Sequence, residues 1–455
     1  MRTQNPLVAT PCGFKSHHRH QQKAAFLRKL LFFFVFHFPD FQLLKTLFFE
    51  ISKNFQKSVD RGRKSWYYNN RRTEVHNKYA DVAELADALD SGSSGSNTVW
   101  VQIPSSAPTK EQLSYEGCSF ALPKRFTLRI REAFMMYDIA ALGELLIDFS
   151  EKQTDPAGYP TMEAHPGGAP ANFLAALSQY RCKTAFLGKV GEDAFGRLLT
   201  ETLNQAGIDT RGLIRDPSVF TTLAFVTLDK SGDRSFSFAR KPGADTRLKF
   251  EELDLSILDE SRAFHFGTLS LTDEPVRTAT QKAAAYAREH GLLITFDPNL
   301  RKPLWNSEED ARHWMLWGLA QADVVKISDE EADFLWGCSP EEGADHLLRD
   351  YGVQLAMVTC GPNGCLLKNR IASCQMRTPS VNPVDTTGAG DIFGGSAVSC
   401  ILALGQSPDS LNKQQLSEIA RFASAAASLS TQQPGGISSI PSLEQVQALC
   451  ARTDW

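Results

Sequence analysis

The sequence of 455 residues contains no pair of cysteines with C-x-x-C spacing. Its nine cysteines are scattered and odd in number, which favours reduced thiols in a cytosolic protein over a zinc site or a disulfide framework. The apolar stretch at 30–38 is interrupted by a histidine and falls far short of the roughly 20 residues that a membrane-spanning helix needs. The G-x-x-x-x-G-K-[ST] loop is missing, as are the H-R-D and D-F-G motifs, which argues against P-loop and protein-kinase chemistry.

Charge divides the chain into two parts. Residues 1–134 contain 20 Lys and Arg against 11 Asp and Glu, whereas residues 135–455 contain 28 against 41. Hydrophobic residues make up 42% of the chain and charged residues 22%, which suits a soluble globular protein with a sizeable core. The asymmetry of charge indicates two segments of different origin or role.

The first 134 residues lack the pattern of a folded enzyme domain. Residues 82–108 resemble the conceptual translation of a transfer-RNA gene, which predicts a physiological start at Met135 or Met136 and a disordered or spurious extension before it. Two other interpretations stay open. A targeting segment is one, because basic residues precede the apolar stretch, and a nucleic-acid-binding arm is the other, because cations and aromatic residues are interleaved at 61–68.

From residue 135 onward the pattern is that of an α/β protein. Apolar runs of strand length occur at 139–142, 292–296, 324–327 and 355–359, and helical stretches occur near 276–290, 308–321 and 340–350. Strands that alternate with helices of this length predict a mostly parallel sheet with helices on both faces.

One segment interrupts this alternation. Residues 221–229 and 235–238 have the pattern of a β-hairpin, in which Phe236 and Phe238 share one face. Ligands of open α/β sheets bind beyond the carboxyl ends of the strands. A hairpin inserted into such a chain is therefore either an extension of the edge of the sheet or a lid over a ligand site there. The apolar face of the hairpin indicates either a homodimer through paired lids or packing on the same domain.

The strongest motif is Val384-Asp-Thr-Thr-Gly-Ala-Gly-Asp391. The small residues Gly388, Ala389 and Gly390 allow three backbone N–H groups to point into a common space at a helix N-terminus, where phosphate is favoured. Asp391 then stands beside the anion, placed to accept a proton from a hydroxyl that attacks phosphorus. A plain helix cap and a dinucleotide-binding turn are the alternatives. The second is disfavoured, because the helix runs near Gly405 into a loop rather than a strand with a terminal acid.

Two stretches together carry a resemblance to a known family. Asp385-Thr-Thr-Gly-Ala-Gly-Asp391 resembles the second signature of the PfkB (ribokinase-like) carbohydrate kinases, and His165-Pro-Gly-Gly-Ala-Pro-Ala-Asn172 resembles the first. Segments 238–245 and 296–305 are most similar to the fructokinases of that family, and residues 1–134 lie outside the resemblance. The resemblance implies a three-layer α/β/α kinase domain over 135–455, with a mostly parallel central sheet and a small β-lid, near 150–164 and 221–241, that closes over the sugar.

The resemblance also implies an activity and roles for individual residues. The activity is transfer of phosphate from ATP to a primary hydroxyl of fructose. Asp391 is the implied general base, Gly388, Ala389 and Gly390 are the implied anion hole, and Arg301 is implied to stabilise phosphoryl charge. The implied sugar contacts are Asp148, Gly168, Asn172, Arg240 (reaching over the substrate) and Asn299. The implied nucleotide contacts are Ser328, Thr359, Gly361 and Gly364, with residues 425–435 beside the adenine.

For metals, the resemblance implies Mg²⁺ organised by Glu331 through water, and a monovalent cation, K⁺, at Asp385 and Thr387. Two departures from the family pattern stand out: Ser328 replaces the usual Asn of an N-x-x-E motif, and Leu146 replaces an Asn of ribokinases, which argues against ribose.

Plainer interpretations stay open for several of these residues. Asp148 is alternatively a surface residue at a strand end, and Gly168 with Asn172 a turn followed by a helix N-terminus. Arg240 is alternatively a solvated arginine, Arg301 half of a structural ion pair, and 329–331 a solvated first helical turn. For the whole domain the alternatives are another kinase of the family, such as a 2-keto-3-deoxygluconate kinase or a ribokinase, or a catalytically silent regulatory homologue. We expect a cytoplasmic protein whose partners are a sugar and ATP, without nucleic acid or membrane.

Overall fold

The computed structural model describes residues 136–228 and 234–452, and the predictions for residues 1–134 lie outside this part. Its centre is a ten-stranded sheet with the order β14-β13-β12-β11-β10-β9-β1-β4-β5, in which β6 also pairs with β4. The pairs from β12 to β5 and β6 are parallel, whereas β13 and β14 form an antiparallel edge. The strands are β1 (Tyr137–Leu142), β4 (Thr184–Gly191), β5 (Ile208–Asp209), β6 (Leu213–Asp216), β9 (Ser261–Gly267), β10 (Leu293–Asp297), β11 (Val324–Ser328), β12 (Leu355–Thr359), β13 (Cys365–Lys368) and β14 (Ser373–Met376).

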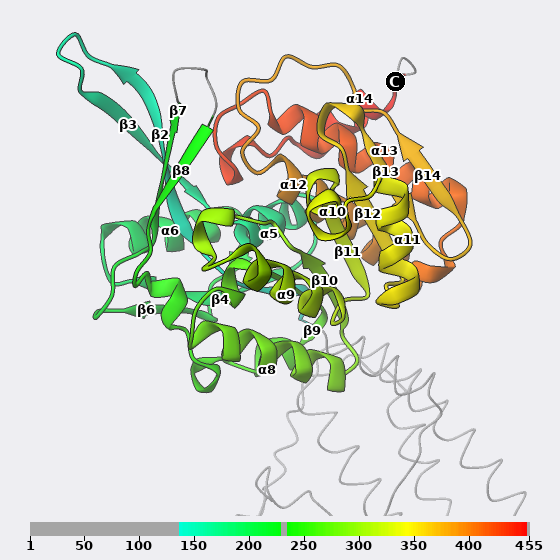
Figure 1. The fold of residues 1–455 in the computed structure, drawn as a ribbon, viewed down its shortest axis with the longest axis horizontal. Coiled ribbons are helices and arrows are strands. Elements are labelled where there is room, and N and C mark those ends of the chain that lie inside the picture. The colour runs from blue at the N-terminus through cyan, green and yellow to red at the C-terminus, as the bar shows by residue number, and fades with distance from the viewer. Residues whose placement is uncertain (1–135, 229–233, 453–455) are drawn as a thin grey trace, which may run out of the picture. The chain divides into compact units, whose positions relative to one another are not determined.

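Helices cover both faces of this sheet (Figure 1). One layer contains α5 (Ala169–Gln179), α6 (Ala194–Gln205), α12 (Ala389–Leu404), α13 (Lys413–Ser430) and α14 (Leu443–Cys450). The other contains α7 (Ser256–Asp259), α8 (Val276–Glu289), α9 (Glu308–Leu319), α10 (Asp329–Trp336) and α11 (Pro340–Asp350). None of the described helices has the length and apolar character needed to cross a bilayer.

The apolar runs form strands because both of their faces are buried. In β1, Ile139 and Ala141 pack in the core beneath α5 and α12, while Ala140 and Leu142 pack in the core beneath α8 and α9. All four side chains are fully buried. This burial confirms the predicted three-layer fold with a mostly parallel sheet.

A second, four-stranded sheet forms the predicted β-lid, with the order β3-β2-β7-β8. Its strands are β2 (Leu146–Thr154), β3 (Pro160–Gly167), β7 (Leu223–Leu228) and β8 (Arg234–Ala239), and they rise together from one side of the domain (Figure 1). The ring of Phe149 stacks on that of Phe225 at 5.4 Å and meets the ring of Phe195 edge-on at 5.6 Å. These contacts hold the lid sheet against α6. Phe238 is half-buried, and the side chain of Phe236 lies outside the described part of the chain.

Candidate active site

The site lies where the carboxyl ends of β10 and β11 meet the first turn of α12. Gly388 is the N-cap of α12, with φ of +75°, a left-handed conformation in which glycine is not strained. A Cβ atom there would stand 3.1 Å from Cα of Gly436 and 3.2 Å from Nδ2 of Asn172. The tight bend therefore needs glycine for space as well as for conformation.

The amides of this bend are the predicted anion hole. The N–H of Ala389 donates to the carbonyl oxygen of Thr386 at 3.3 Å, so this amide already has an acceptor. Within the described residues, no hydrogen bond engages the amides of Gly388 or Gly390. Those two amides, at the positive end of the α12 dipole, form the part of the bend best suited to an anion.

Asp391 sits in the first turn of α12 and is only 8% exposed. Nδ2 of Asn172 donates to its Oδ2 at 2.9 Å, and Nδ2 of Asn299 donates to its Oδ1 at 3.2 Å. Burial raises the pKa of Asp391, whereas the Asn172 hydrogen bond and the positive charges of Lys326 and Arg301 oppose that rise. The carboxylate is thus fixed on both oxygens and is more basic than an exposed aspartate.

Asn172 closes the first turn of α5 and is 3% exposed. Its Nδ2 bonds Asp391, but its Oδ1 has no hydrogen-bond partner among the described residues. A buried acceptor without a donor is costly, so this oxygen fits a hydroxyl group supplied by a ligand. The predicted neighbour Gly168 is the N-cap of α5, with φ of +119°, and a Cβ there would stand 2.5 Å from the carbonyl oxygen of Glu144.

Asp148 lies on β2, at the base of the lid. Burial raises its pKa to about 6; the charge of Arg301 lowers it, and the charges of Asp391 and Asp385 raise it further. Asp148, Arg301 and Asp391 therefore share one electrostatic environment. The structure brings together five predicted residues: Asp148, Asn172, Asn299, Arg301 and Asp391.

Glu331 and Ser328 form a capping box at the start of α10. Oγ of Ser328 accepts from the Glu331 N–H at 3.1 Å, and Oε2 of Glu331 accepts from the Ser328 N–H at 2.8 Å. Oε1 of Glu331 accepts from the Leu300 N–H at 2.7 Å. Because both carboxylate oxygens bond backbone amides, Glu331 suits an indirect, water-mediated role toward Mg²⁺ better than direct ligation. No cluster of three or more His, Cys, Asp or Glu side chains within the described ranges is arranged to hold a metal ion.

Asp385 joins two loops beside the α12 bend. Its Oδ1 accepts from the N–H of Thr387 at 2.9 Å and from Oγ1 of Thr387 at 2.7 Å, and its Oδ2 accepts from the N–H of Gly435 at 3.0 Å. The carbonyl oxygen of Thr431 accepts from the N–H of Val384 and of Asp385. These bonds hold residues 384–387 against residues 431–435. The resemblance implies a monovalent cation beside the first segment and the adenine of ATP beside the second.

The remaining predicted nucleotide residues follow β12. Thr359 ends that strand, and its Oγ1 donates to the carbonyl oxygen of Ile327 at 3.5 Å. Gly361 and Gly364 have positive φ, and a Cβ on Gly364 would stand 2.0 Å from the carbonyl oxygen of Met376. The turn after β12 is thus tight and carries little side-chain bulk, which suits close approach of a ligand.

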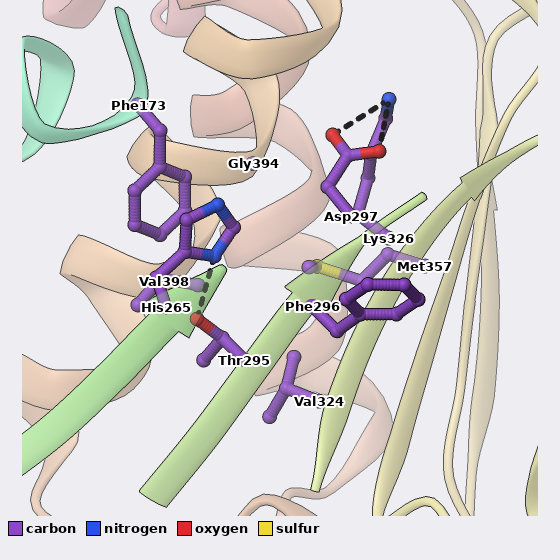
Figure 2. Close-up of a pocket in the computed structure, with 10 residues that line it drawn as sticks. All are labelled: Phe173, His265, Thr295, Phe296, Asp297, Val324, Lys326, Met357, Gly394 and Val398. Atoms are coloured by element: carbon purple, nitrogen blue, oxygen red, sulfur yellow. Dashed lines mark hydrogen bonds and ion pairs between the residues drawn. The ribbon is translucent and has the colours of Figure 1, made fainter. Parts of the chain in front are cut away.

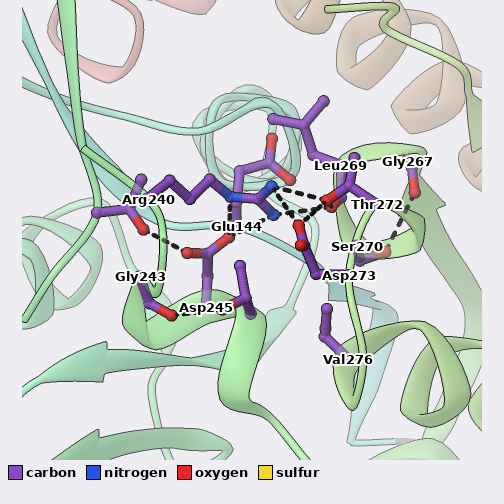
Figure 3. A network of polar contacts seen from close by, with 12 residues as sticks. Glu144, Arg240, Gly243, Asp245, Gly267, Leu269, Ser270, Thr272, Asp273 and Val276 are labelled. Atoms are coloured by element: carbon purple, nitrogen blue, oxygen red, sulfur yellow. Dashed lines mark hydrogen bonds and ion pairs between the residues drawn. The ribbon is translucent and has the colours of Figure 1, made fainter. Parts of the chain in front are cut away.

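Arg240 is a predicted site residue whose polar contacts lie at the base of the lid. It is 4% exposed at the end of β8, and its guanidinium bonds Asp245 at 2.7 and 2.8 Å, Oγ1 of Thr272 at 2.7 Å and the carbonyl oxygen of Leu269 at 2.8 Å (Figure 3). Thr222, at the start of β7, donates to the same Asp245 carboxylate. The predicted reach of Arg240 over a substrate stays a prediction, and the contacts observed are those of an anchor at the base of the lid.

Sequence reasoning assigned no role to three buried polar residues beneath the site: Asp297, Lys326 and His265. Nζ of Lys326 lies 3.0 Å from Oδ2 of Asp297, and Nδ1 of His265 lies 2.9 Å from Oγ1 of Thr295 (Figure 2). The sequence did contain one signal, the lysine within the apolar run 324–327. A strand covered on both faces rarely buries a charge that lacks a partner, so this lysine indicates a buried acidic partner.

Comparison with known proteins gives concordant matches. The model of the pfkB family carbohydrate kinases matches residues 136–443. Fructokinase-1 of Zea mays is 39% identical over 315 residues, which cover 68% of this chain and 97% of that protein. A fructokinase of Vibrio cholerae O395, solved in a form with fructose, ADP and potassium ion, is 30% identical with a TM-score of 0.62, over 70% of this chain and 99% of that one. A putative ribokinase II of E. coli, in complex with ATP and Mg²⁺, is 27% identical with a TM-score of 0.62, over 69% and 99%.

Proposed function

Because the chain belongs to the pfkB family of carbohydrate kinases, we propose that it is an ATP-dependent fructokinase that phosphorylates a primary hydroxyl of D-fructose. The observation that carries this proposal is the environment of Asp391. The carboxylate is buried, is held on both oxygens by Asn172 and Asn299, and lies three residues after the bend that starts at Gly388.

In the proposed reaction, Asp391 accepts the proton of the attacking sugar hydroxyl. The two side-chain amides fix the carboxylate plane, so little reorganisation is needed when the hydroxyl arrives. Burial raises the pKa of Asp391, which strengthens it as a base, while the Asn172 hydrogen bond and the charges of Lys326 and Arg301 oppose this rise.

The transferred phosphoryl group lies against the start of α12. The amides of Gly388 and Gly390 and the helix dipole face its negative charge, and Arg301, whose charge acts on Asp391, adds a cation. Mg²⁺ bound with ATP would neutralise further phosphate charge, and Glu331 would hold it through water.

The sugar lies between the lid and α5. Asp148 accepts hydrogen bonds from sugar hydroxyls, the orphaned Oδ1 of Asn172 accepts one more, and the positive-φ bend at Gly168 allows the backbone to approach the ring. Closure of the lid excludes water, which would otherwise compete for the phosphate.

Nucleotide and cation contacts complete the proposal. Ser328, Thr359, Gly361 and Gly364 contact ATP, and residues 425–435 lie beside its adenine. Potassium binds next to Asp385 and Thr387, a role supported by the potassium ion in the Vibrio cholerae structure.

The assembly and the compartment are also part of the proposal. The lid exposes Tyr159 to 72% at the tip of its first hairpin, and we expect two copies to pair through the lid as a homodimer, which sedimentation analysis tests. The seven cysteines of the described residues are free thiols, as suits the cytoplasm.

A substrate panel tests the proposal. The full chain is assayed by coupled ADP release with ATP and, separately, fructose, ribose, glucose and 2-keto-3-deoxygluconate. We expect the highest kcat/KM with fructose. Preference for 2-keto-3-deoxygluconate would assign a different substrate within the family. If no sugar is turned over and the chain binds DNA in a salt-dependent way, the result would contradict the proposed enzyme and support a catalytically silent regulatory homologue.

A further inference from the structure

A buried lysine lies directly beneath the phosphoryl-binding bend. Lys326 projects from β11 toward α12, and its side chain is 9% exposed. A Cβ atom built on Gly390 would stand 3.0 Å from the Lys326 ammonium nitrogen, so this ammonium touches the underside of the bend. On its other side it pairs with Asp297, at 3.0 Å to Oδ2 and 3.3 Å to Oδ1 (Figure 2).

The surroundings keep this lysine charged. Burial by itself lowers the pKa of Lys326, but the carboxylates of Asp297, Glu331 and Asp391 outweigh burial and raise it. The ring of His265 lines the same small cavity; burial and the charge of Lys326 lower its pKa to about 3, so the imidazole is neutral. Lys326 is therefore a buried cation that offsets the carboxylates of Asp297, Glu331 and Asp391.

A structural ion pair accounts for only part of this arrangement. Pairing Lys326 with Asp297 joins β11 to β10, yet a buried ion pair adds little stability over apolar side chains of the same size. Contact with Asp297 also leaves unexplained why the ammonium lies under Gly390. A fixed cation at that place acts on charge that develops on the other side of the bend, where water cannot screen it.

We propose that Lys326 is a positioning residue for phosphoryl transfer, whose ammonium beneath Gly390 reinforces the anion-binding bend at the start of α12. This inference rests on the proposed function. Its rival is a purely structural role, in which the Lys326–Asp297 pair only joins two strands.

The test removes the whole pair, so that no unpaired charge stays buried. The variant carries Lys326→Met and Asp297→Asn. Its matched control carries Lys189→Met and Glu252→Gln, because Lys189, on β4, is another buried lysine. It pairs with Glu252 at 2.7 Å and, less closely, with Asp216 at 3.4 Å. Circular dichroism and thermal unfolding establish that each variant is folded.

We expect kcat of the Lys326→Met/Asp297→Asn variant to fall at least about tenfold, with KM for sugar and ATP within about threefold. We expect the control pair to keep kcat within about twofold of the unmodified protein, since it lies away from the bend. Should the double variant fail to fold, Lys326→Gln, which keeps a hydrogen-bond donor to Asp297, carries the same expectation.

A binding measurement gives a readout independent of turnover. Calorimetry compares MgADP alone with MgADP plus aluminium fluoride, a mimic of the transferred phosphoryl group. We expect loss of the Lys326 charge to weaken the second complex at least about tenfold and to leave the first nearly unchanged. Wild-type kcat and wild-type affinity for the aluminium fluoride complex in the folded variant would overturn the inference. Inactivity of the unmodified protein toward every sugar would instead contradict the proposed function, and the binding measurement still tests the role of Lys326.

Discussion

Replacing Arg240 by methionine removes the cation at the base of the lid. Arg240 is 4% exposed and its main partner Asp245 is 3% exposed, so the substitution leaves a buried carboxylate without its charge partner. It also removes donors to Thr272 and to the Leu269 carbonyl oxygen. Methionine keeps most of the apolar stem, so the main loss is the buried polar network shown in Figure 3.

The expected cost follows from this geometry. Breaking a buried ion pair by removing one partner costs about 3–5 kcal/mol, because the other charge stays buried. For a domain of this size, that free energy corresponds to a fall in Tm on the order of 10 °C. Urea unfolding followed by circular dichroism measures the loss, and steady-state kinetics on the same sample report KM for the sugar.

The double variant Arg240→Met with Asp245→Asn is the control. Since Asp245 is then neutral, and Asp273, the other carboxylate paired with Arg240, is 43% exposed, we expect it to recover at least half of the lost stability. A loss below about 1 kcal/mol in the single variant, together with a sugar KM raised more than tenfold, would refute the anchoring role and support direct contact of Arg240 with substrate.

Two further predictions concern the bend and the base of the lid. Gly388→Ala is expected to cost about 1–2 kcal/mol through left-handed strain and to lower kcat, since its methyl group would crowd Asn172. Gly337→Ala is the control: Gly337 also has a left-handed φ, of +62°, but a Cβ atom there would have no neighbour within 4 Å. This variant should lose stability and keep its kcat. Equal losses of kcat in the two variants would contradict the role of the Gly388 bend. Burial raises the pKa of Glu144 from 4.5 to about 7, so the native state binds this proton more tightly than the unfolded state does. The stability from this group is therefore complete below pH 4.5 and is lost as the pH rises to 7. As the pH rises from 4.5 to 7, the free energy of unfolding of Glu144→Gln should increase by about 3 kcal/mol relative to that of the unmodified protein, as measured by urea unfolding at several pH values. A difference in unfolding free energy that does not change with pH would contradict the raised pKa of Glu144.

Much of the fold was predictable, because the signal is local. The apolar runs that become β1, β10, β11 and β12 read as strands buried on both faces, and the structure confirms each of them. The antiparallel edge formed by β13 and β14 was not predicted. Short strands at the edge of a sheet bury fewer apolar side chains, so their hydrophobic pattern in the sequence is weak.

The site was predictable in part. The motifs identified Asp391, Asn172 and Asn299, whose contacts the structure now shows. The contact of Lys326 with Asp297 joins residues on separate strands, and no local pattern predicts such a pair. At Glu331, by contrast, the sequence carries the S-x-x-E spacing of a capping box, which explains its bonds to backbone.

The central claim is that the buried carboxylate of Asp391 activates the sugar hydroxyl for phosphoryl transfer. The most direct measurement is kcat of the Asp391→Asn variant with ATP and fructose, beside Asp333→Asn as an exposed control of the same chemical change. We predict a fall in kcat of about 10²–10⁴-fold for Asp391→Asn, with KM for ATP within about threefold, and unchanged kinetics for the control. Turnover of the Asp391→Asn variant within a few-fold of the unmodified enzyme would contradict the claim.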